Sequence, residues 1–483
     1  MIKKSLLLLG AMLAMPLQAM MLPLDPVTQA YLRSIKELKV CYPAALPPPY
    51  VTPDGGLLKD RLLRLADMLP VPLKLSEMAD WQAARAALQR GACDIIPHIG
   101  TLGREDTGLL VSRPMMETDA AILYRGDLRQ ATFLVSSATD TSAILRELHP
   151  GAELRTLRRG ESIYSALEGK KNSAYLGDYL QLRYLMREYP ADGLRLRRLL
   201  GDERVVSYRL MMRNDPELAK FVDTLIRYMP AGTLYTDLSR YMDQGALYIN
   251  RLHFNDAEQA WLSGRRRVVR LVMNPQLMPY SGINDQGEAK GWSADILNWV
   301  TQESGLKYML VPAATKAEAI EKLRSGEADM MAGLPESPEL ADDFTFSRMI
   351  SINRFALISK RAISADKFSQ LGKQRILVPE SLYDPSLLAQ LGDQEWVRTD
   401  DLSQGITLLQ QGKADAMLSE LYQLQYPQRT HLLEGLQIKE LDDRFGLGFA
   451  IRKDQTELAG VIDRNLMALI PRSTNLTSVG AVW

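Results

Sequence analysis

The chain contains an internal repeat with a spacing of 235 residues. Gly91 in "QRGACDIIP" is matched by Gly326 in "RSGEADMMA", and Ser112 in "VSRP" is matched by Ser347 in "FSRM". Each copy begins with a strand-like run, a Pro-Tyr pair, a glycine-containing turn and an amphipathic helix pattern. A repeat this long indicates two similar domains in tandem, rather than a single fold that uses the whole chain once.

Within each copy, strand-like runs alternate with helical patterns, which predicts α/β units with mostly parallel sheets. Two such stretches are joined by extended segments near 115–125 and 349–360. This arrangement predicts a two-lobed module with a crevice between the lobes. We expect module one at 33–243, a linker at 244–267 and module two at 268–483. Within the linker, "NDAEQAWL" predicts a short helix capped by Asn255 or Asp256.

The first 19 residues have the three parts of a secretory signal peptide. Lys3 and Lys4 precede an apolar run at 5–15, and "LQA" ends in a small residue. The run is too short to span a membrane, so we expect cleavage after Ala19 and a mature protein in the periplasm. The alternative is an N-terminal anchor that is not cleaved.

Composition narrows the possible functions. The formal net charge is zero, with 46% hydrophobic and 24% charged residues, which describes a globular protein without the basic surface that nucleic acid requires. The four histidines are scattered without metal-ligand spacing, so we expect neither a metal nor a cofactor. Cys41 and Cys93 could form a disulfide in an exported protein or remain two buried thiols.

Several motifs recur in order in this chain: the Pro-Pro-Tyr that ends at Tyr50, the "G..D" strand that contains Asp94, a "T..R" turn and a following "S.P". Together they resemble the family 3 periplasmic solute-binding proteins, over nearly the whole mature chain and twice. The resemblance implies two tandem type II periplasmic-binding-protein modules, or Venus flytraps, that close on amino acids or similar solutes. The tandem arrangement is similar to the sensor region of hybrid histidine kinases that carry two such modules.

The resemblance also implies a ligand site in module one. The arginine of "T..R", which in the family holds the ligand carboxylate, falls on Arg104, with Thr101 beside it. The carboxylate for the ligand ammonium falls on Asp178, in the other lobe. An Arg fork grips a carboxylate with two parallel hydrogen bonds. The other candidates are Thr139 at a helix N-terminus, and Tyr50, Trp81 and Tyr42 as an apolar wall.

These residues also have structural interpretations. Arg104 could be a surface arginine, and Asp178 a charge at a helix N-terminus. Tyr50 and Trp81 could be core aromatics. One extra residue between Arg104 and the following serine also departs from the family spacing.

The second copy departs from the pattern. Leu340 stands where the arginine is expected, and Glu420 stands at the ammonium position. We therefore expect an amino-acid-like ligand in module one only. Module two would bind something else, or nothing.

The function expected from these patterns is binding of a small polar solute for sensing or uptake, with a membrane sensor or transporter as partner and no enzymatic activity. Two alternatives remain. One is a structural adaptor with degenerate clefts. The other is a dehydratase-like enzyme on the same fold, which would need an acid and a base in the cleft.

Overall fold

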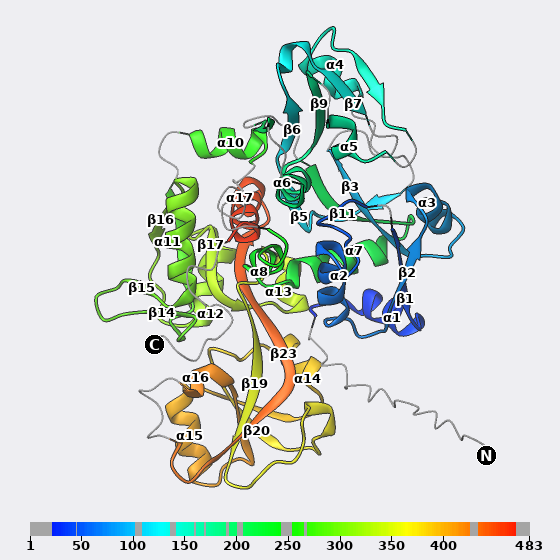
Figure 1. Cartoon of the computed structure of the whole chain (residues 1–483). Helices are drawn as coiled ribbons and strands as arrows, with labels where there is room; N and C mark the ends of the chain where they lie inside the picture. Colours follow the sequence, from blue (N-terminus) through cyan, green and yellow to red (C-terminus); the bar gives the residue numbers. More distant parts are fainter. Residues whose placement is uncertain are drawn as a thin grey trace, which may run out of the picture.

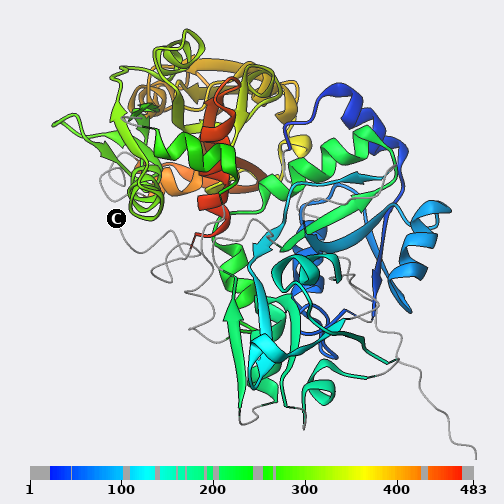
Figure 2. The ribbon, with the colours of Figure 1, turned by 90° about the horizontal axis from the view of Figure 1, so that it is seen from above.

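The computed structural model describes most of the chain as two modules of two lobes each (Figures 1 and 2). The described residues are 22–44, 46–101, 109–135, 142–158, 161–168, 171–189, 193–199, 206–242, 254–264, 268–425 and 433–469. We name the lobes 1A and 1B in module one, and 2A and 2B in module two. No helix among these residues is long and apolar enough to cross a membrane.

Lobe 1A is built on a sheet with the strand order β2-β1-β3-β11-β4, and β5 also pairs with β11. The strands β1, β2 and β3 are parallel, and β11 returns antiparallel to β3. Its strands are β1 (Leu38–Pro43), β2 (Leu73–Met78), β3 (Ile95–Thr101), β4 (Leu110–Val111), β5 (Met116–Thr118) and β11 (Val206–Met212). Its helices are α1 (Pro26–Ser34), α2 (Leu57–Ala66), α3 (Trp81–Gln89), α7 (Pro216–Tyr228) and α8 (Thr233–Leu238).

Lobe 1B is built on a separate sheet with the strand order β10-β6-β9-β7-β8 (Figure 1). Its strands are β6 (Ala120–Arg125), β7 (Thr132–Val135), β8 (Leu154–Thr156), β9 (Ser173–Asp178) and β10 (Leu194–Arg198). Its helices are α4 (Ser142–Leu148), α5 (Ile163–Leu167) and α6 (Tyr179–Glu188). The chain therefore passes from lobe 1A into lobe 1B after β5 and returns before β11.

Module two repeats this order, but one sheet of nine strands continues through both lobes, in the order β16-β12-β17-β23-β19-β22-β20-β21 with β18 on β23. The long strands β19 (Ser351–Ser359) and β23 (Gln437–Arg452) run from lobe 2A into lobe 2B (Figure 1). A three-stranded sheet of β13 (Gln276–Leu277), β14 (Ser281–Ile283) and β15 (Ala289–Lys290) adds to lobe 2A.

The remaining elements of module two fall into two sets. Lobe 2A contains β12 (Val268–Met273), α11 (Trp292–Ser304), β16 (Lys307–Leu310), α12 (Lys316–Arg324), β17 (Met330–Pro335), α13 (Pro338–Asp343), β18 (Phe344–Phe346) and α17 (Thr456–Met467). Lobe 2B contains β20 (Arg375–Pro379), α14 (Pro385–Leu391), β21 (Glu395–Thr399), α15 (Leu402–Gln410), β22 (Ala416–Glu420) and α16 (Leu421–Gln425).

The repeated "G..D" motif has the same structural role in both modules. Gly91 and Gly326 follow α3 and α12 with φ of 71° and 81°, a left-handed conformation in which a side chain would be strained. Three residues later, Asp94 accepts a hydrogen bond from the backbone N–H of Lys39 at 2.9 Å. The carboxylate of Asp329 accepts one from the N–H of Arg270, also at 2.9 Å. The aspartate thus fixes where β3 or β17 begins beside the first strand of its module.

Two helices lie at the expected domain boundaries. α10 (Asp256–Ser263) begins in the linker as expected, with Asn255 as its N-cap and a capping box to Glu258. α1 begins before residue 33, the expected start of module one. Its Thr28 hydroxyl donates to Glu217 on α7, so this helix is part of lobe 1A.

Candidate ligand-binding site

Tyr50 and Asp178 meet between the lobes of module one. Asp178 ends β9 in lobe 1B and caps α6, where its Oδ1 accepts the N–H of Gln181 at 2.9 Å. Tyr50 lies in lobe 1A, after the cis Pro48–Pro49 bond, and its hydroxyl donates to the same Oδ1 at 2.5 Å. Both side chains are buried, with 1% and 5% of their surface exposed. A hydrogen bond thus joins the two lobes.

Burial controls the ionisation of this pair. It raises the pKa of the Asp178 carboxyl, although the hydrogen bonds from Gln181 and Tyr50 act in the opposite direction. Burial also raises the pKa of Tyr50, and the neighbouring carboxylate adds to the shift. Tyr50 therefore remains the donor at neutral pH. The ring of Tyr208 on β11 lies 4.5 Å from the Tyr50 ring, centroid to centroid, and holds it in place.

Module two contains the same contact at equivalent positions. Glu420 ends β22 in lobe 2B, and its carboxylate accepts the N–H groups of Tyr422 at 3.1 Å and Gln423 at 2.8 Å. Tyr280, which follows the cis Met278–Pro279 bond in lobe 2A, donates its hydroxyl to Glu420 at 2.9 Å. Burial raises the pKa of Glu420 to about 7, although these hydrogen bonds oppose the shift.

The other expected site residues have different placements. Arg104 and Thr139 lie outside the described residues. Thr101 is the last residue of β3, where its backbone pairs with Val206. Trp81 begins α3, with its ring 5.8 Å from that of His98, and packs against the cluster around the two cysteines. Tyr42 lies on β1 and donates its hydroxyl to Glu77 at 3.3 Å. Of the seven candidates, the described contacts join Tyr50 with Asp178.

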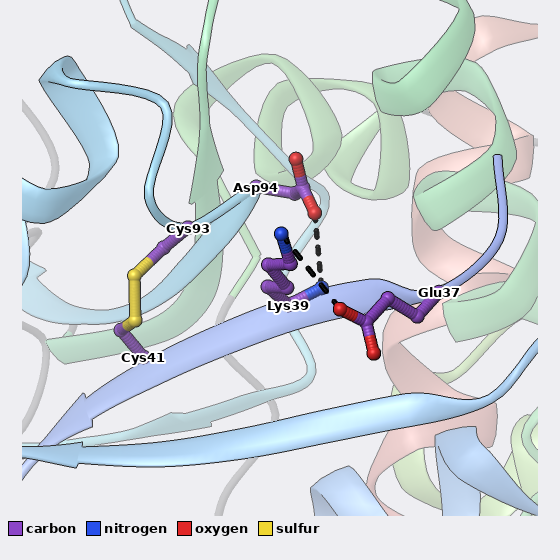
Figure 3. The surroundings of a disulfide bond; sticks show 5 residues. All are labelled: Glu37, Lys39, Cys41, Cys93 and Asp94. Atoms are coloured by element: carbon purple, nitrogen blue, oxygen red, sulfur yellow. Dashed lines mark hydrogen bonds and ion pairs between the residues drawn. A yellow bond between two sulfur atoms is a disulfide. The ribbon is translucent and has the colours of Figure 1, made fainter.

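Cys41 and Cys93 form a disulfide within lobe 1A, with their Cα atoms 5.9 Å apart (Figure 3). Cys41 lies on β1, and Cys93 immediately precedes Asp94, whose carboxylate bonds the backbone of Lys39 two residues before Cys41. The bridge and this hydrogen bond together hold β1 to the start of β3. The described residues contain no cluster of three or more histidine, cysteine or acidic side chains that could hold a metal ion.

Glu380 is a residue of the module two cleft that the sequence reasoning missed. It follows β20 in lobe 2B, and its carboxylate accepts the backbone N–H groups of Lys316 at 3.3 Å and Ala317 at 3.2 Å in lobe 2A. These N–H groups open α12, and a helix N-terminus favours an anion. Arg398 pairs with the same carboxylate at 3.3 Å. The available sequence signal was an acid directly after a strand in "LVPES".

Further contacts close the module two cleft. The Ser337 hydroxyl donates to Asp384 at 3.1 Å, and the Lys316 ammonium donates to the Tyr383 carbonyl at 2.6 Å. Leu340, at the position where the family has its arginine, is buried on α13 with 5% of its surface exposed. Protein groups therefore satisfy one another across this cleft, and the arginine position carries an apolar side chain.

Comparisons with known proteins agree with this architecture. Residues 269–474 match the family model described as bacterial extracellular solute-binding proteins, family 3. The sensor protein EvgS of Escherichia coli O157:H7 is 21% identical over 445 residues, which are 86% of this chain and 36% of EvgS. The virulence sensor protein BvgS of Bordetella bronchiseptica is 23% identical over 463 residues, 92% of this chain and 37% of BvgS. The chain thus spans little more than a third of the length of these relatives.

Among solved structures, the periplasmic domain of BvgS from B. pertussis is 21% identical, with a TM-score of 0.42, and the match covers 95% of this chain and 93% of that domain. The structure described as a BvgS periplasmic VFT2 domain is 24% identical, with a TM-score of 0.40, and the match covers 47% of this chain and 97% of that domain. The described structure is a tandem of two two-lobed modules, and the part of the chain that forms module two matches the family 3 solute-binding model.

Proposed function

We propose that the chain is the periplasmic ligand-sensing region of a membrane sensor, in which module one closes on an amino-acid-like solute. The hydrogen bond from Tyr50 to Asp178 carries this proposal, because it places a buried carboxylate of lobe 1B against lobe 1A. The relatives EvgS and BvgS, both named as sensor proteins, favour sensing over uptake.

The Tyr50 hydroxyl and the Gln181 N–H both bond Oδ1 of Asp178, and Tyr208 also interacts with this buried carboxylate. In this proposal a ligand ammonium group would take the place of part of these contacts when it binds. Arg104 would bind the ligand carboxylate from the other lobe. A solute that contacts both residues binds the closed state more tightly than the open state, because it touches both lobes only when the module is closed. Binding therefore shifts the equilibrium between the open and closed states, and this shift is the signal.

Module two, in this proposal, is a relay that takes no free amino acid. Leu340 offers no donor for a carboxylate, and leaving such a charge unpaired costs about 2–5 kcal/mol, or roughly 30-fold to several thousand-fold in affinity. Glu380 already occupies the N-terminus of α12, and Asp384 already accepts a hydrogen bond from Ser337 across the two lobes. Module two therefore holds itself closed with its own carboxylates.

Calorimetry on the full mature chain with a panel of free amino acids tests the proposal. We expect one binding event, which Arg104→Ala or Asp178→Asn weakens at least roughly 30-fold. The matched control is Glu420→Gln, the equivalent change in module two, which should leave the affinity unchanged. If Asp178→Asn binds as tightly as the wild type, the site assignment is wrong. A melting temperature that no solute shifts would favour a structural adaptor, and turnover of a bound solute would favour an enzyme.

A further inference from the structure

Lobe 1B carries a hollow of about 650 Å³ that shares no lining residue with the ligand-binding site. Its wall comes from the end of β6, the turn that follows, the end of α4 and the edge strand β10. A volume of this size falls within the range of small-molecule sites. The side chains that matter in the argument are Tyr124, Arg125, Arg129, His149, Arg195 and Arg197.

The strand pairing explains why arginines gather here. Arg195 and Arg197 are two residues apart on β10, so their side chains leave the same face of the sheet. In the antiparallel register Arg195 lies opposite Tyr124, which places this ring on the same face. Arg125 ends β6, and Arg129 follows in the next turn. The four arginines that line the hollow thus come from two strands and a turn, with Arg195 and Arg197 on the same face of the sheet as Tyr124.

These four arginines lack carboxylate partners among the described residues. Asp127 is the only acid in the lining, and its Oδ1 accepts the backbone N–H of Arg129. Elsewhere in the same lobe, Arg155 pairs with Glu161 at 3.0 Å, and Arg198 pairs with Asp119. The hollow therefore has an excess of three positive charges, which the described part of the lobe does not neutralise.

The lining also contains side chains that are not charged. Partial burial lowers the pKa of the His149 imidazole, and the nearby charge of Arg197 lowers it further. This side chain is therefore neutral at pH 7, and its ring nitrogens can accept one hydrogen bond and donate another. Tyr124 supplies an aromatic surface. Charged edge strands also discourage edge-to-edge pairing, but that role needs no hollow lined by further arginines from β6 and the turn after it.

We propose that this hollow binds a small molecule with two or more negative charges, of which organic phosphates are the best match. Guanidinium forks pair with phosphate oxygens bidentately, and a phosphate monoester or diphosphate neutralises most of the excess charge. The volume exceeds that of a phosphate group alone, so the rest of the ligand would contact Tyr124 and Leu128. The same phosphate chemistry could come from a soluble compound or from a lipid headgroup.

The test uses the full mature chain, with adenosine diphosphate and inorganic pyrophosphate as soluble probes and phosphatidylglycerol vesicles as the lipid arm. We expect binding that weakens as salt is raised and that Arg195→Ala/Arg197→Ala reduces at least roughly tenfold. The matched control is Arg33→Ala/Arg90→Ala, which removes two exposed arginines of lobe 1A and should leave the affinity unchanged.

Each outcome decides for or against the proposal. Binding of the soluble probes that depends on Arg195 and Arg197 supports a soluble ligand, and vesicle binding with the same dependence supports a lipid headgroup. If no probe binds, or if the control variant loses as much affinity as the hollow variant, the proposal is overturned. Arg195→Lys/Arg197→Lys keeps the charge, so a loss with these changes supports recognition by the guanidinium fork rather than charge alone.

Discussion

Glu420 makes the stability of module two depend on pH. Its carboxyl group is fully buried, and burial raises its pKa to about 7 from the usual 4.5. Below pH 4.5 the group is protonated in both the folded and the unfolded chain, so folding pays no cost for burying a charge. Above pH 7 it is ionised in both states, and the folded state carries the full cost. Stability from this group is therefore lost as the pH rises from about 4.5 to 7.

The expected size of the effect follows from the shift. Each pKa unit corresponds to 1.36 kcal/mol, so the shift of Glu420 predicts a loss of about 3 kcal/mol between pH 4 and pH 8. Hydrogen bonds from Tyr280, Tyr422 and Gln423 already reduce the shift, because each stabilises the charged form. Tyr280→Phe should therefore raise the pKa further and steepen the pH dependence.

The assay is urea denaturation of the full chain at several pH values, with the wild type compared with Glu420→Gln. The amide is neutral at every pH, so subtracting the two curves cancels all other titrating groups. We expect the advantage of Glu420→Gln over the wild type to grow by about 3 kcal/mol from pH 4 to pH 8. A difference that stays constant across this range would show that Glu420 titrates normally, and the reasoning from its burial would be refuted.

Three further predictions concern other parts of the chain. Glu336→Gln leaves Arg227 buried without its partner and should cost about 3–5 kcal/mol by urea denaturation, whereas replacing both with apolar residues should cost much less. Cys41→Ser removes a disulfide between residues 52 apart and should lower the free energy of unfolding by about 4 kcal/mol. Thiol titration of the wild type, denatured without reductant, should detect no free thiol at Cys41 or Cys93. The intact mass of the exported protein should correspond to a chain that begins near Met20, and a retained leader would contradict this.

The repeat made most of the fold predictable from sequence. The spacing between Gly91 and Gly326 marks the same helix end in both modules, and both glycines have positive φ. The start of α10 followed from the capping residue Asn255. α1 escaped prediction because each module was taken to begin at its first strand, although "QAYL" at 29–32 in α1 is repeated as "QAWL" at 259–262 in α10. Its place is decided by tertiary contacts such as Thr28 with Glu217.

The candidate site was less predictable, because its key contacts cross between lobes. The sequence pointed to Tyr50 and Asp178 separately, as an apolar wall and an ammonium acceptor, but no spacing rule joins residues 128 positions apart. Glu380 was missed for the same reason. Its partners on α12 precede it by more than 60 residues and are backbone N–H groups, which leave no trace in side-chain identity.

The contacts between the modules indicate how a signal could pass from one to the other. Arg227 lies in the last turn of α7 in module one and pairs with the buried Glu336 of lobe 2A. The next residue, Ser337, bonds Asp384 across the module two cleft. If α7 moves when module one closes, it pulls on Glu336 through Arg227. Glu336 is next to Ser337, so the movement would reach the hydrogen bond between the two lobes of module two. Buried ion pairs resist gradual deformation, because losing a partner is costly, so this link favours a change between two discrete arrangements over a continuous one.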